Sequence, residues 1–77
     1  MARVRYFAAA AERAGRNDED RSEITLGALR DALSRERPGL GAILPKCAVL
    51  VDGARVADAT EIGPDVTIDI LPPFAGG

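Results

Sequence analysis

The feature that most restricts the fold is an alternating run near the end of the chain, followed by two prolines. In residues 66–70 apolar and polar side chains alternate, as in a strand with one buried face. Pro72 and Pro73 then end the pairing, because proline has no N–H to donate to a sheet. This run is the most apolar of the longer candidate strands. We therefore place it at the centre of the sheet, beside the first strand.

The first third of the chain predicts two strands and a helix. Residues 2–7 alternate and predict the first strand. Residues 8–14 are rich in alanine, the best helix former, and predict a short helix that ends at Gly15. The charged run 15–21 is expected to be a polar loop, and residues 22–25 a short edge strand.

The middle of the chain predicts the main helix. Thr25 is the expected N-cap, and Pro38-Gly39 ends the helix. Residues 40–45 form an apolar connector with at most one helical turn. The helix carries an apolar stripe that we assign to the core, made of Leu26, Leu29, Ala32 and Leu33.

Two further strands are expected before the last one. Residues 48–51 are a continuous β-prone run, and Asp52-Gly53 is a strong signal for a tight hairpin turn. Residues 54–57 would return as the fourth strand, and residues 58–65 would form a loop. The predicted order is β-α-β-α-β-β-β.

This order predicts an α+β domain spanning residues 1–77, with a mixed sheet of about five strands. In so short a chain the main helix must pack across one face of the sheet. That face should carry Val4, Tyr6, Val66, Ile68 and Ile70, against Leu26, Leu29 and Leu33. The opposite, open face should carry Arg3, Arg5, Thr67 and Asp69, with an Arg–Asp cross-strand pair, together with Phe7 and Leu71.

Composition argues against catalysis by the domain's own side chains. The 77 residues include no histidine, the commonest general base, and one cysteine, Cys47. Cys47 borders an apolar run, which favours a buried, protonated thiol over a nucleophile. The net charge of −2 gives no field that attracts nucleic acid, and no apolar run approaches membrane-spanning length. We expect no metal, no nucleic acid, no membrane and a cytoplasmic location.

The last two residues, Gly76 and Gly77, have no explanation in packing. Glycine loses the most backbone entropy on ordering, so this ending does not serve stability. It suits a carboxylate that threads through a narrow channel, with Pro72-Pro73 as a stiff spacer. The alternative is an accidental, unstructured tail. The prolines directly after a strand, and the aromatic Phe74, favour the first interpretation.

The closing pattern Leu71-Pro72-Pro73-Phe74-Ala75-Gly76-Gly77 resembles the end of the small subunit of molybdopterin synthase, in the MoaD/ThiS family. The family also opens with a strand that runs into Phe-Ala and a short helix, as at Phe7-Ala8. It has a Thr-capped second helix and a Gly-x-Asp turn before the last strand, as at 63–65 here. The resemblance covers the whole chain and implies the ubiquitin-like β-grasp fold, with a flexible arm at 72–77.

The resemblance also implies a function as a sulfur carrier in molybdenum cofactor biosynthesis. The carboxylate of Gly77 would be adenylated and then converted to a thiocarboxylate, which donates sulfur to a cyclic pyranopterin precursor. The chain would be the non-catalytic small subunit of a heterotetrameric synthase, whose large subunit supplies the catalytic side chains. Residues expected to bind that partner are Phe7, Leu71, Pro72, Pro73, Phe74, Ala75 and Gly76.

The implied partners are the large synthase subunit, a ubiquitin-activating-like adenylyltransferase and a sulfur donor of the cysteine desulfurase or rhodanese type. No cofactor is expected to stay bound, and the activating enzyme would consume ATP. Two alternative functions use the same terminus. One is sulfur transfer in another pathway, such as thiamine thiazole, cysteine or tRNA thiolation. The other is attachment to proteins as a ubiquitin-like modifier.

Overall fold

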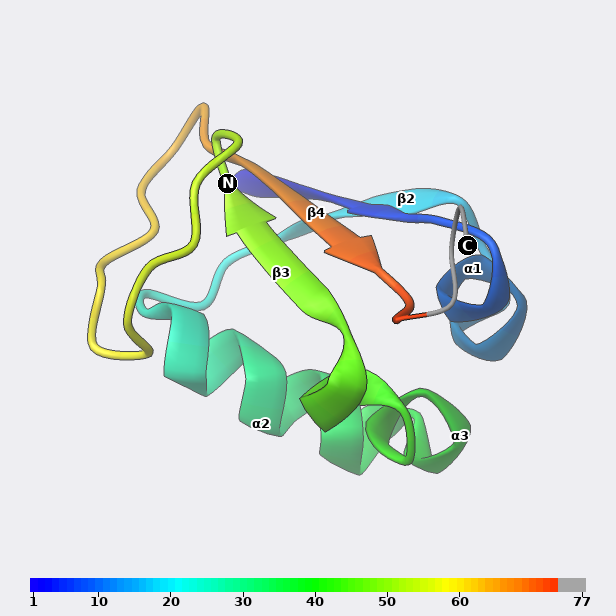
Figure 1. The fold of residues 1–77 in the computed structure, drawn as a ribbon. Coiled ribbons are helices and arrows are strands. Elements are labelled where there is room, and N and C mark those ends of the chain that lie inside the picture. Colours follow the sequence, from blue (N-terminus) through cyan, green and yellow to red (C-terminus); the bar gives the residue numbers. More distant parts are fainter. Residues whose placement is uncertain (74–77) are drawn as a thin grey trace.

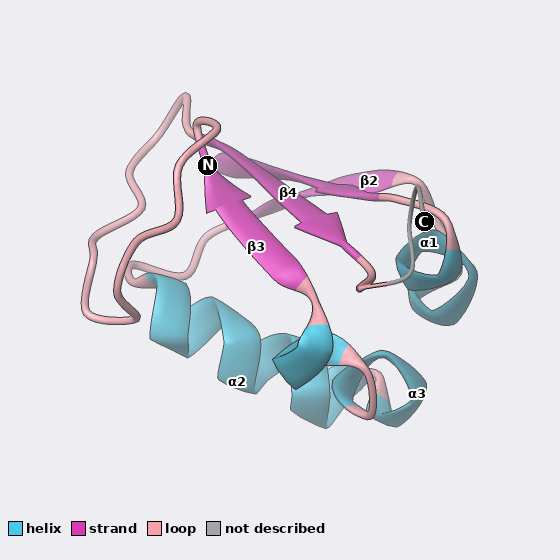
Figure 2. Cartoon of the chain, viewed as in Figure 1, coloured by secondary structure: helices cyan, strands magenta, loops and turns pink. Residues whose placement is uncertain are grey.

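The computed structural model describes residues 1–73, which form a four-stranded mixed sheet with helices on one side (Figures 1 and 2). The strands lie in the order β2-β1-β4-β3. β1 and β4 are parallel, whereas β2 is antiparallel to β1 and β3 is antiparallel to β4. The bounds are β1 Ala2–Tyr6, α1 Ala9–Ala14, β2 Asp18–Arg21, α2 Leu26–Glu36, α3 Pro38–Gly41, a 3-10 turn at Leu44–Lys46, β3 Ala48–Val51 and β4 Thr67–Leu71.

The core lies between the sheet and α2, the main helix. Side chains alternate along β1, so Val4 and Tyr6 are buried while Arg3 and Arg5 are exposed. The same period places Ile68 and Ile70 of β4 in the core. The predicted packing of one main helix across one face, with the last strand central, is confirmed. The helix contributes the predicted stripe, Leu26, Leu29, Ala32 and Leu33.

The start of α2 is fixed by its own cap and by a distant loop. Thr25 Oγ1 accepts a hydrogen bond of 3.1 Å from the Ala28 N–H, as an N-cap should. The N–H groups of Leu26 and Gly27 donate to the carbonyls of Thr60 and Asp58, at 3.0 and 2.8 Å. A helix leaves its first N–H groups without partners inside the helix, and here the loop before β4 supplies them.

This loop explains why the strand predicted at 54–57 is wrong. The turn Asp52-Gly53 forms, with φ values of 49° and 86°, and Val51 and Ala54 exchange two backbone hydrogen bonds. The chain then leaves the sheet and runs to the start of α2, as the long loop between β3 and β4 shows (Figure 2). The carbonyls of this loop accept hydrogen bonds from the first N–H groups of α2 rather than from β3. Residues 1–73 therefore contain four strands and not five.

The second strand lies four residues earlier than predicted. The prediction of a loop at 15–21 and a strand at 22–25 is wrong, because β2 is Asp18–Arg21. Its side chains alternate although all of them are charged: Asp18 and Asp20 are exposed, and Glu19 is buried. Residues 22–25 instead approach the loop before β4, where the Ile62 N–H donates to Ile24 O at 2.7 Å.

Both predicted ends of helices are close to those observed. Gly15 caps α1 with φ 76°, a left-handed conformation that glycine adopts at no steric cost. α2 ends at Glu36, and Pro38 then begins the short helix α3 rather than a loop. Within residues 1–73, no helix is both long and apolar enough to span a bilayer.

Candidate functional site

The central strand β4 carries the chain out of the sheet beside the end of β1 (Figure 1). The Phe7 N–H donates to Ile70 O at 3.1 Å, which continues the parallel ladder one residue beyond β1. Leu71, the last residue of β4, is half-buried. Whatever follows Leu71 therefore starts from the end of the sheet where Phe7 lies.

The two prolines after β4 differ in exposure. Pro72 is buried, and Pro73 is exposed. Pro72 thus packs with the body of the domain, and Pro73 is the first exposed residue after the strand. The remaining residues predicted to act here, Phe74, Ala75, Gly76 and Gly77, lie outside the described part of the chain, so their roles and the flexibility of the arm stay predictions.

Phe7 is an exposed aromatic residue held by its neighbours on the open face. The residue is 37% exposed, and the Arg5 guanidinium lies 5.7 Å from the centre of its ring. Arg5 is itself fixed by two hydrogen bonds to the Asp69 carboxylate, at 2.6 and 2.8 Å. The hydrogen bond and charge of Asp69 raise the pKa of Arg5. The cross-strand pair predicted from the sequence is confirmed, and it places the Phe7 ring beside a bidentate ion pair.

The turn that follows Phe7 contains a strained residue. Ala8 has φ 49° and ψ −123°, a conformation that a residue with a Cβ adopts at a cost. Backbone hydrogen bonds on both sides maintain it: the Ala10 N–H donates to Phe7 O, and the Ala11 N–H donates to Ala8 O, both at 3.0 Å. This turn lets α1 begin immediately while the Phe7 side chain stays on the open face.

The open face also carries charges that sequence reasoning assigned to a loop. Arg3 contacts Asp18 at 3.0 Å and Asp20 at 3.1 Å, and all three side chains are about half exposed. The pattern that could have predicted this strand is the alternation in 18–21, where Asp18 and Asp20 lie on one face and Glu19 on the other. Apolar periodicity does not detect it, since all residues of β2 are charged.

The helix side of β2 holds a buried carboxylate that the sequence analysis did not identify. Glu19 is 9% exposed, and the Tyr6 hydroxyl donates to its Oε2 at 2.7 Å. Arg37 Nη1 lies 2.7 Å from the same oxygen. Burial alone would raise the pKa of Glu19, but hydrogen bonds from Tyr6, Arg37 and Arg21 outweigh it and lower the pKa. The carboxylate therefore stays charged inside the domain.

Arg21 completes this network. Its guanidinium donates two hydrogen bonds to Glu23, two to Glu36 and one to Glu19, which uses all the donors that arginine has. These bonds lower the pKa of Glu23 and Glu36. With no donor left over, Arg21 is a structural residue rather than a binding one.

Neither a reactive thiol nor a metal cluster is present in the described part of the chain. Cys47 is half-buried and its thiol donates to Ile43 O at 3.3 Å. Burial raises the pKa of this thiol, as expected for a structural cysteine. Among residues 1–73, no group of three His, Cys, Asp or Glu residues could hold a metal ion. The end of the sheet where β4 leaves it thus carries the exposed Phe7 and the half-buried Leu71, next to Pro72 and Pro73.

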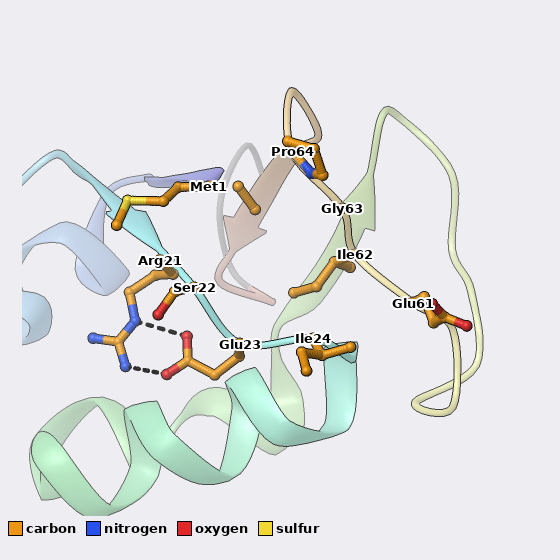
Figure 3. A pocket seen from close by; sticks show the side chains of 10 residues that line it. Met1, Arg21, Ser22, Glu23, Ile24, Glu61, Ile62, Gly63 and Pro64 are labelled. Carbon is orange, nitrogen blue, oxygen red and sulfur yellow. Dashed lines mark hydrogen bonds and ion pairs between the residues drawn. The ribbon is translucent and has the colours of Figure 1, made fainter.

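A groove of about 320 Å³ lies at the opposite end of the sheet, where β1 begins. Met1 and Pro64 lie on one side of it and Ile24 and Ile62 on another, while Arg21 is held by Glu23 (Figure 3). The groove lies at the start of β1, whereas Phe7 and the end of β4 lie at the other end of that strand. We assign it no part in the site.

Comparison with curated protein sequences finds no match. Among solved structures, molybdopterin-converting factor from Helicobacter pylori, a complex of subunits 1 and 2, is similar. It shows 26% identity, covers 99% of this chain and 97% of that chain, and has a TM-score of 0.74. The small archaeal modifier protein SAMP1 from Haloferax volcanii shows 25% identity, covers 99% and 98%, and has a TM-score of 0.76.

A Pyrococcus furiosus protein assigned as molybdopterin converting factor subunit 1 has a TM-score of 0.85. It covers 94% of this chain and 95% of that chain at 17% identity, which shows the fold alone. The predicted ubiquitin-like β-grasp fold is confirmed by these neighbours, a fold that sulfur carriers and ubiquitin-like modifiers share. Residues 4–77 match the ThiS family. The chain belongs to the ThiS family.

Proposed function

We propose that this chain is a sulfur carrier of molybdenum cofactor biosynthesis, the small subunit of a molybdopterin synthase. Its place in the ThiS family and the similarity to a Helicobacter pylori complex of subunits 1 and 2 support the proposal. The observation that carries it is the course of β4. This central strand ends beside Phe7 and leads directly into Pro72 and Pro73. In the sequence, Phe74, Ala75 and the Gly-Gly pair follow.

In this proposal the chemistry takes place on the carboxylate of Gly77. A carboxylate is ionised in the cell, with a pKa of about 3.5, and it is a poor electrophile because its leaving group would be oxide. An adenylyltransferase converts it to an acyl adenylate with ATP and releases pyrophosphate. A persulfide on a desulfurase or rhodanese-type donor then attacks the acyl carbon and displaces AMP, which gives an acyl disulfide. A second thiol, of the donor or of a cellular thiol reductant, reduces this disulfide, so the thiocarboxylate is released and the two thiols end as a disulfide. The large subunit would direct this sulfur onto a cyclic pyranopterin.

The domain itself contributes position rather than chemistry. Phe7 and Leu71 would contact the large subunit at the base of the arm, and Pro72-Pro73 would set the reach of Gly77. Phe74, Ala75 and Gly76 would line the channel of whichever enzyme holds the terminus. Side chains that move protons would belong to the large subunit.

A second candidate function is that of a protein modifier. The similarity to SAMP1 favours it to the same degree, since the identity is 25% against 26% for the Helicobacter pylori subunit. In that case the acyl adenylate would acylate lysines of target proteins. Both functions require Gly77 and an activating enzyme. They differ in the group that displaces AMP, which is the sulfur of a donor in the first function and a lysine amine of a target protein in the second.

One experiment separates the two functions. The purified chain is incubated with its activating enzyme, ATP and a sulfur source, and the intact mass is measured. We expect one oxygen-to-sulfur exchange, localised to Gly77 by fragmentation and absent without ATP. Addition of the large subunit and a cyclic pyranopterin should then yield molybdopterin. Isopeptide-linked conjugates without molybdopterin would favour the modifier. An unchanged mass, with an activating enzyme that is shown to be active on another carrier, would contradict the sulfur-carrier function.

A further inference from the structure

The outer edge of β2 is an open sheet edge. The Tyr6 N–H donates to Asn17 O at 2.8 Å, which fixes the alternation of the antiparallel pair. With Val4 opposite Glu19 and Ala2 opposite Arg21, the backbone groups of residues 17, 19 and 21 face β1. The N–H and C=O groups of Asp18 and Asp20 therefore point away from the sheet. No backbone partner for these groups is found within residues 1–73, and both residues are exposed.

Unpaired backbone groups along a strand edge are a template for another strand. β2 is the end of the sheet in the order β2-β1-β4-β3 (Figure 1). At the other edge of the sheet, formed by β3, the N–H and C=O of Val51 are hydrogen-bonded to the backbone of Ala54. Val49, the other residue of β3 on this edge, is buried. Of the two sheet edges, that of β2 is the one left open to an incoming chain.

The side chains beside this edge define the charge of what can pair with it. Asp18 and Asp20 are 55% and 52% exposed and share one cation, Arg3, so the three together carry a net charge of +1 − 2 = −1. A second copy of β2 would bring two more carboxylates to the same line, and like charges placed opposite each other disfavour strand pairing. The charges beside this edge therefore disfavour pairing with a second copy of β2 and favour pairing with a basic strand.

We propose that the outer edge of β2 binds an extended, basic segment of another protein by strand addition. The segment would carry lysine or arginine at alternate positions, facing Asp18 and Asp20 on the open side of the sheet. β1 already shows this arrangement on the inner side of β2, where Arg3 lies opposite Asp20 and Arg5 opposite Asp18. The edge lies two strands from β4, about 10 Å away at 4.8 Å per strand.

The test uses a peptide that copies residues 2–6, with both ends capped, and the isotope-labelled full chain. The control peptide has glutamate in place of both arginines. Amide shifts and hydrogen exchange are followed at Asp18 and Asp20. We expect the basic peptide to shift these two amides and slow their exchange. The doubly substituted variant D18K/D20K should bind the basic peptide about tenfold more weakly, because two attractive pairs become repulsive.

Two single variants distinguish strand addition from simple ion pairing. Asp20→Asn removes the charge, whereas Asp20→Pro also removes the outward N–H and leaves the bonds to β1 intact. Asp20→Pro should weaken binding of the basic peptide several-fold more than Asp20→Asn does. Equal binding of the two variants, equal binding of the glutamate peptide, or no effect of either peptide at millimolar concentration would overturn the proposal. Should Asp20→Pro fail to fold, the exchange of the Asp18 and Asp20 amides in the unsubstituted chain decides: unchanged rates overturn it.

Discussion

The Tyr6 hydroxyl donates a hydrogen bond of 2.7 Å to Glu19 Oε2, and this contact joins β1 to β2 beneath the sheet. Both side chains are buried. Burial and the bond to Glu19 raise the pKa of Tyr6, so the hydroxyl remains a donor at all physiological pH values. A charged strand can lie at the edge of this sheet because its one inward carboxylate accepts hydrogen bonds from Tyr6, Arg21 and Arg37, and Arg16 lies 3.8 Å away.

The first prediction concerns acid. The pKa of Glu19 is lower in the folded chain than in the unfolded one, so its contribution is present above the unfolded pKa of about 4.3. It is lost as the pH falls through the folded-state pKa. Glu19→Gln should lower the free energy of unfolding at pH 7 by about 2 kcal/mol, since it removes the anion that the partly buried Arg37 guanidinium contacts, whereas Arg21 keeps Glu23 and Glu36. Urea unfolding between pH 7 and pH 3 measures this.

The matched control for this prediction is Glu61→Gln, which changes an exposed carboxyl group. It should leave stability within about 0.5 kcal/mol of the original at every pH. The difference between Glu19→Gln and the parent should also shrink as the pH falls below the unfolded pKa, because the unfolded state then binds a proton more readily than the folded state does. A constant difference across the pH range would show that shape, and not charge, is what Glu19 supplies.

The second prediction concerns the strained turn after β1. Ala8→Gly should raise the free energy of unfolding by about 1 kcal/mol, because glycine adopts φ 49° without a Cβ penalty. In a domain of this size that corresponds to a rise in Tm of about 4–8 °C. Ala11→Gly, inside α1, is the opposite control and should lower stability by about 1 kcal/mol. If both substitutions destabilise equally, Ala8 is not strained.

The strands whose burial follows apolar periodicity were predictable from the sequence. β1 and β4 alternate between apolar and polar residues, and β3 is a continuous β-prone run. The N-cap at Thr25 and the left-handed Gly15 follow from residue type and position alone. The open-face pair Arg5–Asp69 followed once β1 and β4 were placed side by side.

β2 was not predictable in this way, because its burial depends on partners distant in the chain. Glu19 can be buried only because Arg37, eighteen residues later, and Tyr6 supply its partners. The strand expected at 54–57 failed for a similar reason. The carbonyls of Asp58 and Thr60 accept hydrogen bonds from the first N–H groups of α2, which need partners outside the helix. The residue pattern in 54–60 gives no sign of this contact with a distant helix.

The third prediction tests the docking surface at the base of the arm. Phe7→Ala should weaken binding to the large subunit by about 2 kcal/mol, as truncation of an interface aromatic commonly does. Its effect on Tm should be small, because the ring is on the open face and not in the core. Titration calorimetry and a thermal scan measure the two effects. Phe74→Ala is expected to behave in the same way.

The control for Phe7 is Ile24→Ala. Ile24 is 71% exposed but lies at the other end of the sheet, beside the groove where β1 begins. Its truncation should leave binding to the large subunit unchanged. A similar loss for both variants would mean that partner binding responds to overall surface apolarity. A large fall in Tm for Phe7→Ala would show instead that the ring supports the fold.

The last prediction concerns one alanine appended after Gly77. In the proposed function the carboxylate must lie at a fixed reach beyond Pro73, within the channels of two different enzymes. One extended residue moves the reactive carbon by up to about 3.5 Å and adds a methyl group. A misplacement of about 1 Å can already cost on the order of a hundredfold in rate. The core residues of the described part of the chain all precede the terminus, and we expect Tm not to change.

The extended chain should therefore fold normally and support essentially no conversion of the pterin precursor to molybdopterin. The assay includes an intact-mass measurement after the reaction, which shows whether a protease has trimmed the added residue. A second variant with alanine in place of Gly77 keeps the length and adds only the methyl group, so it separates reach from width. Conversion at the normal rate by an untrimmed, extended chain would mean that the carboxylate of Gly77 is not the group that carries sulfur. If the extended chain loses activity and Gly77→Ala retains it, the position of the carboxylate matters and the width of the last residue does not. This is the result expected if Pro72 and Pro73 act as a spacer of fixed length.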